Sequence, residues 1–392
     1  MSSPTDENFT GGTDLAELLA DLEPLVNCES PSKDLAAVGR SADLIAEIGT
    51  RRLGVEPDRI EIDGCSHLRW RFGPGPNRVV ILAHHDTVWP IGSLAGHPWS
   101  LDGGVLRGPG TVDMKAGLVQ AIHALSGLLA DGVDLTGSCL LVTGDEEIGS
   151  PTSRALIEDE ARGCAACFVL EGAGSAGALK TGRKGTSAYR FDITGRAAHA
   201  GIEPEKGINA GVELSHLILA VAAMGVPETG TTVTPTVAAV GTTTNTVPAA
   251  AFLEIDVRVS SQAEQDRVDQ QLRSVQPTLP GAVLTVSGGP NRPPMEPASG
   301  AALFARADEL SQRHGWGALT QTTVGGASDG NFTAGIGVPT LDGLGAVGGG
   351  AHADDEHVLV DLLVPRTQLL MALLTDVLDG GLDGGRPPDL LR

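Results

Sequence analysis

The 392-residue sequence has few basic residues, few aromatic residues and no long apolar run. Its 27 Lys and Arg residues stand against 49 Asp and Glu residues, which gives a formal net charge of −22. Such a surface repels nucleic-acid phosphates and anionic membranes, so we expect neither as a partner. No apolar segment approaches the length of a membrane span. The stretch 1–13 is polar and acidic, unlike a signal peptide, so we expect a cytoplasmic protein. We also expect this stretch to be disordered.

Cysteine is scarce as well. The odd number of cysteines and their scattered positions argue against a disulfide framework: Cys28, Cys65, Cys139, Cys164 and Cys167. Cys164 and Cys167 have the CxxC spacing, but they lead into an apolar run and no second pair follows. We therefore expect buried free thiols rather than a metal or redox site.

Strand-like and helix-like segments alternate in the first half of the chain. Short apolar runs predict buried strands at 79–83, 139–143 and 167–170. Helical spacing of apolar residues predicts helices at 14–28, at 34–52, near 153–160 and in a segment ending near 130. This alternation is typical of an α/β domain whose mixed, mostly parallel sheet has helices on both faces.

The pattern changes after Gly185. An α+β block follows, with predicted strands at 187–194, 232–240, 251–259 and 282–286 and predicted helices at 207–224 and 263–274. We therefore expect one domain formed by two parts, 1–183 and 294–392, and a second domain inserted between them at 184–293. The proline-rich stretch 290–294 is expected to be the exit linker, and a last helix is expected at 359–378.

Acids and histidines follow the predicted strands or lie in glycine-rich loops, at His84, Asp113, Glu146, Glu147, Glu171 and His352. Strand ends of an open α/β sheet converge on one crevice, where ligands bind. Imidazoles together with carboxylates suit zinc, and less specifically cobalt or manganese. Taken alone, the acids 145–147 could also be solvated residues at a helix N-terminus. Six candidates predicted for one crevice favour a metal site.

Five motifs of this sequence resemble those of the M20 metallopeptidase family, which includes glutamate carboxypeptidase, acetylornithine deacetylase and succinyl-diaminopimelate desuccinylase. They are HHDTV at 84–88, GTVDMKAG at 110–117, GDEEIGS at 144–150, EG at 171–172 and AHADDE at 351–356. The resemblance covers nearly the whole chain, and the motifs are specific jointly. It implies a zinc-peptidase-like catalytic domain in which 184–293 is a lid or dimerisation domain.

The resemblance also implies a metal centre with two Zn²⁺ per subunit, for which Co²⁺ or Mn²⁺ are alternatives. His84 and Glu171 would bind one ion, Glu147 and His352 the other, and Asp113 would bridge them. A bridging carboxylate can hold two ions roughly 3.5–4 Å apart, so that both act on one attacking oxygen.

Three other residues of these motifs have different expected roles. Asp86 resembles the carboxylate that orients a metal-binding imidazole. Glu146 resembles the general base, which takes a proton from a metal-bound water and delivers it to the leaving nitrogen. Side chains alternate along a strand, so His85 points away from His84 and we expect it to be structural.

Residues of the inserted domain match the family's lid. His199 resembles a histidine that reaches the active site of the partner subunit, which implies a homodimer formed through the lid. Asn245 and Arg258 resemble substrate-binding residues, and a guanidinium suits a free carboxylate. Gly325 and Gly326 resemble a substrate loop with free backbone N–H groups. Segments 182–186 and 290–295 would be the hinges of lid motion.

The sequence therefore predicts a glutamate-carboxypeptidase-like hydrolase that cleaves an amide bond next to a free carboxylate. Its substrate would be a small peptide or an N-acyl amino acid. Two alternatives stay open: an N-acyl amino acid deacylase, which would use the same catalytic residues, and a catalytically silent relative that serves as a binding or structural dimer. The second is disfavoured because every implied catalytic position holds a competent residue.

Overall fold

The computed structural model describes residues 13–382, so that the predicted disordered stretch at the N-terminus, except for residue 13, lies outside the described part. Contacts divide the chain into two compact units. Unit 1 consists of residues up to Gly182, Pro297–Val324 and the residues from Ser328 onward. Unit 2 consists of Arg183–Glu296 together with Gly325–Ala327. Residues 294–296 and Gly325–Ala327 differ from the expectation, which placed the whole of 294–392 in the first domain.

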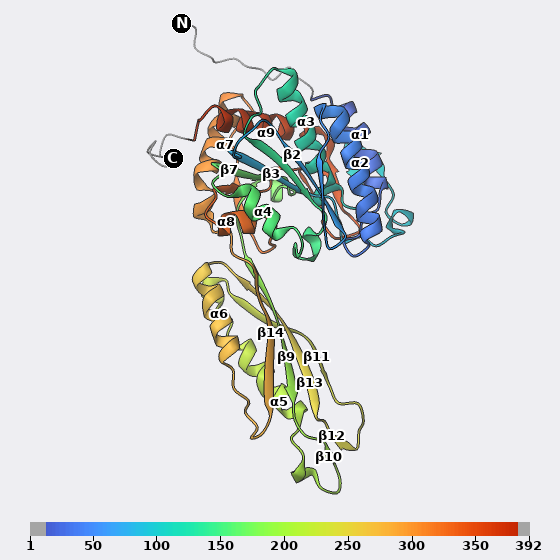
Figure 1. Ribbon diagram of the computed structural model, residues 1–392, viewed down its shortest axis with the longest axis vertical. Coiled ribbons are helices and arrows are strands. Elements are labelled where there is room, and N and C mark those ends of the chain that lie inside the picture. The colour runs from blue at the N-terminus through green and yellow to red at the C-terminus, as the bar shows by residue number, and fades with distance from the viewer. Residues whose placement is uncertain (1–12, 383–392) are drawn as a thin grey trace. The chain divides into compact units, whose positions relative to one another are not determined.

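Unit 1 is built on a six-stranded mixed sheet (Figure 1). In spatial order its strands are β1 (Asp58–Ile62), β2 (Cys65–Arg71), β6 (Ser138–Thr143), β3 (Val79–His84), β7 (Ala166–Val169) and β16 (Thr340–Leu341). The last four are parallel to one another, and β1 and β2 form an antiparallel edge. The predicted α/β class with a mostly parallel mixed sheet is confirmed.

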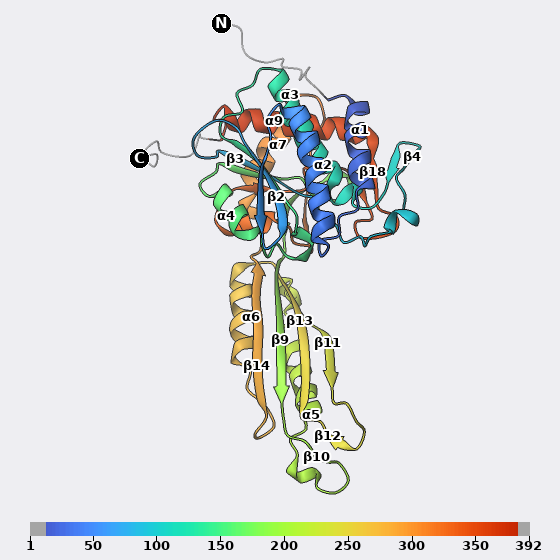
Figure 2. The ribbon, with the colours of Figure 1, turned by 45° about the vertical axis from the view of Figure 1, so that its right-hand side comes forward.

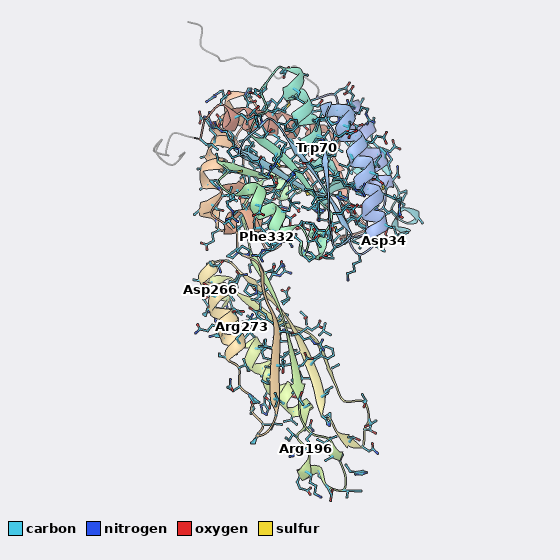
Figure 3. All side chains as sticks on the ribbon, in the orientation of Figure 1. Asp34, Trp70, Arg196, Asp266, Arg273 and Phe332 are labelled. Carbon is cyan, nitrogen blue, oxygen red and sulfur yellow. The ribbon has the colours of Figure 1, made fainter. Side chains whose placement is uncertain are left out.

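Helices cover both faces of this sheet because its central strands are apolar on both sides. In β3, Val79 and Ile81 join one hydrophobic core, whereas Val80 and Leu82 join the other. The first core packs against α1 (Leu15–Asn27), α2 (Leu35–Leu53), α3 (Ala116–Ala130), α7 (Ala301–Arg313) and α9 (Leu363–Leu378). The second packs against α4 (Arg154–Ala161) and α8 (Gly330–Gly335). Trp70 and Phe332, labelled in Figure 3, belong to the first and the second core respectively.

Two smaller sheets complete unit 1. One contains β17 (Gly348–Gly349), β18 (His357–Leu359), β5 (Val105–Arg107) and β4 (Ser100–Asp102), and the other pairs β15 (Gln321–Val324) with β8 (Leu179–Arg183), whose last residue belongs to unit 2. The last helix begins later than predicted, because the residues at its expected start form β18 and a short 3₁₀ turn.

Unit 2 is a four-stranded antiparallel sheet with two helices (Figure 2). The strands in spatial order are β11 (Thr232–Val240), β13 (Ala250–Val259), β9 (Gly185–Thr194) and β14 (Val283–Arg292), and the helices are α5 (Ala210–Ala222) and α6 (Gln262–Ser274). Alternate residues of β13, such as Leu253 and Val257, are buried, as expected for a sheet covered on one face.

One boundary in unit 2 was predicted wrongly. Pro290 to Arg292 belong to β14, where Pro290 lies opposite Ser187, instead of forming an exit linker. A register shift between Pro290 and Arg292 accommodates the proline. Because β14 is an edge strand of the sheet, a residue that lacks an N–H group is tolerated there.

The expectation of free thiols agrees with the structure. All five cysteines lie in the described part of the chain and are free thiols, although Cys28 is only half-buried. Among residues 13–382, no helix combines the length and the apolar character needed to cross a membrane.

Candidate metal centre

The carboxyl ends of three neighbouring parallel strands form the floor of the candidate site. β3 ends at His84, the turn after β6 carries Glu146 and Glu147, and Glu171 follows β7. These strands lie next to each other in the order β6, β3, β7. The sheet therefore brings together acids and a histidine that lie far apart in the sequence, as expected at the strand ends of an open α/β sheet.

Asp113 stands between the two histidines. Its Oδ1 lies 3.1 Å from Nε2 of His84, and its Oδ2 lies 3.2 Å from Nε2 of His352. Glu171 Oε1 is 3.6 Å from the same nitrogen of His84, and Glu147 Oε2 is 3.1 Å from that of His352. The residues thus form two imidazole–carboxylate sets that share the carboxylate of Asp113.

The electrostatics of both sets favour bound cations. Burial alone would lower the pKa of His84, but hydrogen bonds with Asp113, Asp86 and Glu171 raise it well above its usual value. Hydrogen bonds with Asp113 and Glu147 raise the pKa of His352 to about 10. The carboxylates therefore stabilise positive charge on the imidazole rings of both His84 and His352.

Glu147 supplies a second indication that the residues fit metal ions. Its Oε1 is buried and has no hydrogen-bond partner among residues 13–382. A buried carboxylate oxygen without a partner is costly unless a cation or a proton binds it. Nitrogen and carboxylate oxygen are also the ligand types that zinc accepts.

Asp86 organises the site more extensively than the sequence indicated. The Nδ1 atom of His84 lies 2.9 Å from the backbone carbonyl of Asp86 and 3.4 Å from its carboxylate. This carboxylate also accepts hydrogen bonds from the backbone N–H groups of Glu146 and Glu147, both at 3.1 Å, and from Ser32 Oγ at 2.6 Å. Asp86 therefore orients one imidazole and holds the turn that carries two acids. The sequence carried no signal for Ser32.

Glu146 lies on the His84 side of the site. It is buried, and one of its carboxylate oxygens falls within 4.8 Å of ligand atoms of His84 and Glu171. Glu146 is thus close enough to exchange a proton with a molecule held by these residues.

Two other groups near the site are structural. His85 is buried, and its Nε2 contacts the carbonyl of Ser66 at 3.1 Å, in agreement with the structural role expected for it. Cys65, His67 and Asp145 also lie close together. However, His67 accepts a hydrogen bond from the Gly144 N–H and contacts Thr152, which donates to Asp145. Both ring nitrogens of His67 and Oδ2 of Asp145 are therefore engaged by neighbouring protein groups.

The lid candidates lie in unit 2, where the structure separates them. His199, in β10 (Ala198–His199), pairs with β12 (Thr246–Val247), and the backbone carbonyl of Asn245 accepts a hydrogen bond from Ala200. Arg258 lies near the end of β13 that pairs with Thr186, whereas His199 lies beyond the end that pairs with Thr194. The guanidinium of Arg258 is paired with Asp256 at 2.9 Å. Within one chain, His199 and Asn245 are therefore neighbours, and Arg258 is not near them.

The loop that contains Gly325 and Gly326 is held through its carbonyl groups. Arg183 donates hydrogen bonds to the carbonyls of Gly326 and Ala327, at 3.1 and 3.3 Å. A Cβ atom added at Gly325 would meet no atom within 4 Å, so this part of the loop is open. The expectation that the N–H groups of Gly325 and Gly326 bind a substrate carboxylate stays a prediction.

The fold and the candidate site define the class as metallopeptidases and related amidohydrolases. The chain belongs to peptidase family M20/M25/M40, whose profile matches residues 80–376.

Its relatives include carboxypeptidase G2 from Pseudomonas sp. (strain RS-16), with 31% identity over 368 residues, or 91% of this chain and 88% of that protein. Succinyl-diaminopimelate desuccinylase from Thioalkalivibrio sulfidiphilus is 26% identical over 349 residues, or 83% and 90% of the two chains. The fold resembles the crystal structure of an M20 family metallo-carboxypeptidase from Sulfolobus solfataricus, with a TM-score of 0.73 and 16% identity over 92% of this chain and 99% of that one.

Proposed function

We propose that the protein is a di-metal hydrolase that cleaves an amide bond next to a free carboxylate. The observation that carries this proposal is the position of Asp113, whose two oxygens face two different imidazoles at 3.1 and 3.2 Å. A carboxylate placed in this way can bridge two cations. His84 and Glu171 would complete one set of ligands, and His352 and Glu147 the other.

Zinc fits this mixture of nitrogen and carboxylate ligands, and cobalt or manganese are alternatives. When bound, the ions would acidify a water molecule and polarise the carbonyl of the scissile amide. Asp86 keeps the imidazole of His84 oriented for this task through its contacts with Nδ1.

Glu146 is proposed as the general base. Its carboxylate would take a proton from the attacking water and deliver it to the leaving nitrogen. The backbone N–H of Glu146 is bound by Asp86, so the position of this base is fixed by the same residue that orients His84.

The substrate is proposed to be a small peptide or an N-acyl amino acid with a free carboxylate. Similarity to carboxypeptidase G2 over most of both chains supports a carboxypeptidase. Similarity to succinyl-diaminopimelate desuccinylases favours a second candidate, an N-acyl amino acid deacylase. Both reactions break an amide bond and use the same catalytic groups.

We further propose that His199 acts in the partner subunit of a homodimer. The eight steps along the strand from Ala250, which pairs with Thr194, to Arg258 span roughly 26 Å at about 3.3 Å per residue. His199 lies beyond the Thr194 end, and Figure 3 shows the nearby Arg196 at the opposite end of unit 2 from Asp266. A small substrate cannot contact both His199 and Arg258 of one chain, whereas two chains could supply one each.

The hydrogen bonds of His199 suit such a role. Its Nδ1 accepts a hydrogen bond from the N–H of Gly201 at 3.1 Å, which leaves Nε2 to carry the ring proton. An Nε2–H group can donate to the negatively charged oxygen that develops as an amide is attacked. Arg258, near the end of β13 that is remote from His199, would bind the substrate carboxylate.

The surface of unit 2 supports the homodimer. β11 is an edge strand of the sheet, and an edge strand presents backbone groups that can pair with a second chain. Val237 and Val240 on β11 are exposed. Leu219 on the neighbouring helix α5 is 72% exposed. We propose that this surface joins two copies of the chain.

The first experiment combines metal analysis with a Glu146→Gln variant. We expect the wild type and the variant each to bind two metal ions, and the variant to lose most of its amidase activity because Gln cannot accept the proton. Glu158→Gln, which changes a helix acid paired with Arg154, is the control and should stay active. A variant at Glu146 with two bound ions and full activity would disprove the assignment of the base.

A substrate panel separates the two candidate reactions. Dipeptides and N-acyl glutamates would be compared with N-acetyl amino acids, with zinc or cobalt added and with a chelator as control. Preference for peptides or N-acyl glutamates supports the carboxypeptidase, and preference for N-acetyl basic amino acids supports the deacylase. Metal-independent turnover would contradict both.

The subunit arrangement is tested by mixing two inactive variants, His199→Ala and Arg258→Ala. A mixed dimer contains one site with both residues intact if His199 acts in the partner subunit and Arg258 in its own. We expect partial recovery of activity on mixing. An intact mixed dimer without any recovery would refute the arrangement.

A further inference from the structure

Glu356 is a buried acid at the end of the last family motif, and the proposed mechanism gives it no role. Its Oε1 accepts hydrogen bonds from the backbone N–H groups of Val112 at 2.9 Å and Asp113 at 3.2 Å. Its Oε2 accepts from the backbone N–H of Gly110 at 3.0 Å and from the indole N–H of Trp89 at 2.7 Å. One carboxylate therefore binds three N–H groups of segment 110–113.

Glu356 shares a tight turn with His352. Within this turn the N–H of Ala353 donates to the carbonyl of Gly350 at 2.8 Å, and the N–H of Glu356 donates to the carbonyl of Ala353 at 2.9 Å. His352 contacts the side chain of Asp113, while Glu356 binds its backbone N–H. The same turn thus holds Asp113 through its side chain and through its main chain.

We propose that Glu356 is the positioning residue of the metal centre. By fixing the backbone of segment 110–113, it places the carboxylate of Asp113 between His84 and His352. This inference rests on the proposed function, because the distance between the two imidazoles matters only if both bind ions that Asp113 bridges. Glu356 is not a ligand in this proposal: both of its oxygens are occupied by N–H donors.

The physical reason is the demand of the backbone for hydrogen-bond partners. Segment 110–113 forms no regular strand, and three of its four N–H groups, those of Gly110, Val112 and Asp113, are directed at one carboxylate. Without that carboxylate, each buried N–H would need a new partner or would be left unsatisfied, so the segment would shift. A displacement there moves Asp113 directly, and groups that orient metal ligands typically affect metal affinity about 10- to 100-fold.

The test is the metal affinity of a Glu356→Gln variant, measured by competition with a chromophoric chelator. Gln has nearly the same shape, but its NH₂ group would face N–H donors in place of one oxygen. We expect affinity for at least one of the two ions to fall about 10- to 100-fold. The absorption spectrum of the cobalt-loaded protein should also change, because the geometry around the ions depends on Asp113.

Glu213→Gln is the matched control. Glu213 is a buried acid of unit 2 whose oxygens accept backbone N–H groups of Thr278 and Leu279 at 2.8 and 2.7 Å. Its replacement should lower thermal stability through the same loss of hydrogen bonds and leave metal affinity and the cobalt spectrum unchanged. A general loss of stability is thereby separated from a specific effect on the ligands.

A Glu356→Asp variant keeps the experiment decisive if the Gln variant does not fold. Its shorter side chain retains the carboxylate but cannot reach all four donors, so weaker metal binding is expected here too. Wild-type affinity and an unchanged cobalt spectrum in a folded Glu356 variant would overturn the inference. Wild-type protein that binds no metal would instead overturn the proposed function, so the two failures are distinguishable.

Discussion

Replacement of Asp86 by Asn tests the hydrogen-bond network that supports the candidate metal centre. In the wild type, Asp86 Oδ1 accepts the N–H of Glu146 and Oδ2 accepts the N–H of Glu147, both at 3.1 Å. Asn offers one oxygen and one NH₂ group, so in either orientation one backbone N–H faces a second donor. An unsatisfied buried N–H costs about 1–3 kcal/mol, and we expect the free energy of unfolding to fall by about 2 kcal/mol.

The same change should weaken metal binding. Asn cannot hold Nδ1 of His84 through a carboxylate, and it releases part of the turn that carries Glu147. Loss of such a group typically weakens metal affinity about 10- to 100-fold. Urea unfolding would be measured on protein freed of metal by a chelator, so that bound ions do not contribute to stability. Metal affinity would then be measured separately by titration.

Asp34→Asn is the control for this experiment. Asp34 caps helix α2 by accepting the N–H of Ala37 at 3.0 Å, and Asn is an equally good cap. The control should therefore keep wild-type stability and metal affinity. If Asp86→Asn matched the wild type in both measurements, the hydrogen-bond network of Asp86 would not support the site. If only stability fell, Asp86 would support the fold without orienting the ligands.

Two further predictions concern stability. Burial raises the pKa of the Asp21 carboxyl, but hydrogen bonds from His123 and two arginines outweigh burial and lower it from 3.8 to about 2. The lowered pKa stabilises the folded state by about 2 kcal/mol above pH 4, and this stabilisation is lost as the pH falls to about 2. In urea unfolding, the free energy of unfolding should therefore fall less between pH 4 and pH 2 for Asp21→Asn than for the wild type. The second prediction concerns Gly117, where an added Cβ atom would lie 1.9 Å from the carbonyl oxygen of Leu170. Gly117→Ala should therefore lower the melting temperature and reduce the free energy of unfolding by about 1–3 kcal/mol. Gly96→Ala is the control and should change neither, because a Cβ atom at Gly96 would meet no atom within 4 Å.

Each of these predictions has a clear contrary result. A wild type and an Asp21→Asn variant that lose stability equally between pH 4 and pH 2 would show that Asp21 does not contribute to the acid sensitivity. A Gly117→Ala protein that melts at the wild-type temperature would show that α3 can move away from Leu170 at no cost.

The fold class could be predicted from the sequence because burial leaves a local periodic pattern. Apolar runs predicted the central strands β3, β6 and β7, and the change of pattern after Gly185 marked the start of a different kind of sheet. The motifs placed metal-binding residue types after those strands. Parallel strands end at the same edge of a sheet, so a common crevice for His84 and Glu171 could be predicted from the sequence alone.

Tertiary structure alone decided which groups hold the candidate ligands in place. Ser32 donates to Asp86 across 54 residues of sequence, and Gly110 donates to Glu356 across 246. Such pairs leave no periodic signal, because they depend on how distant loops meet after the cores have packed. The strand register of unit 2 likewise decided that His199 and Arg258 of one chain lie far apart. The sequence by itself determined the fold class and the residue types of the candidate centre. Long-range packing determined the geometry of that centre, because hydrogen bonds need fixed distances whereas burial needs only a pattern.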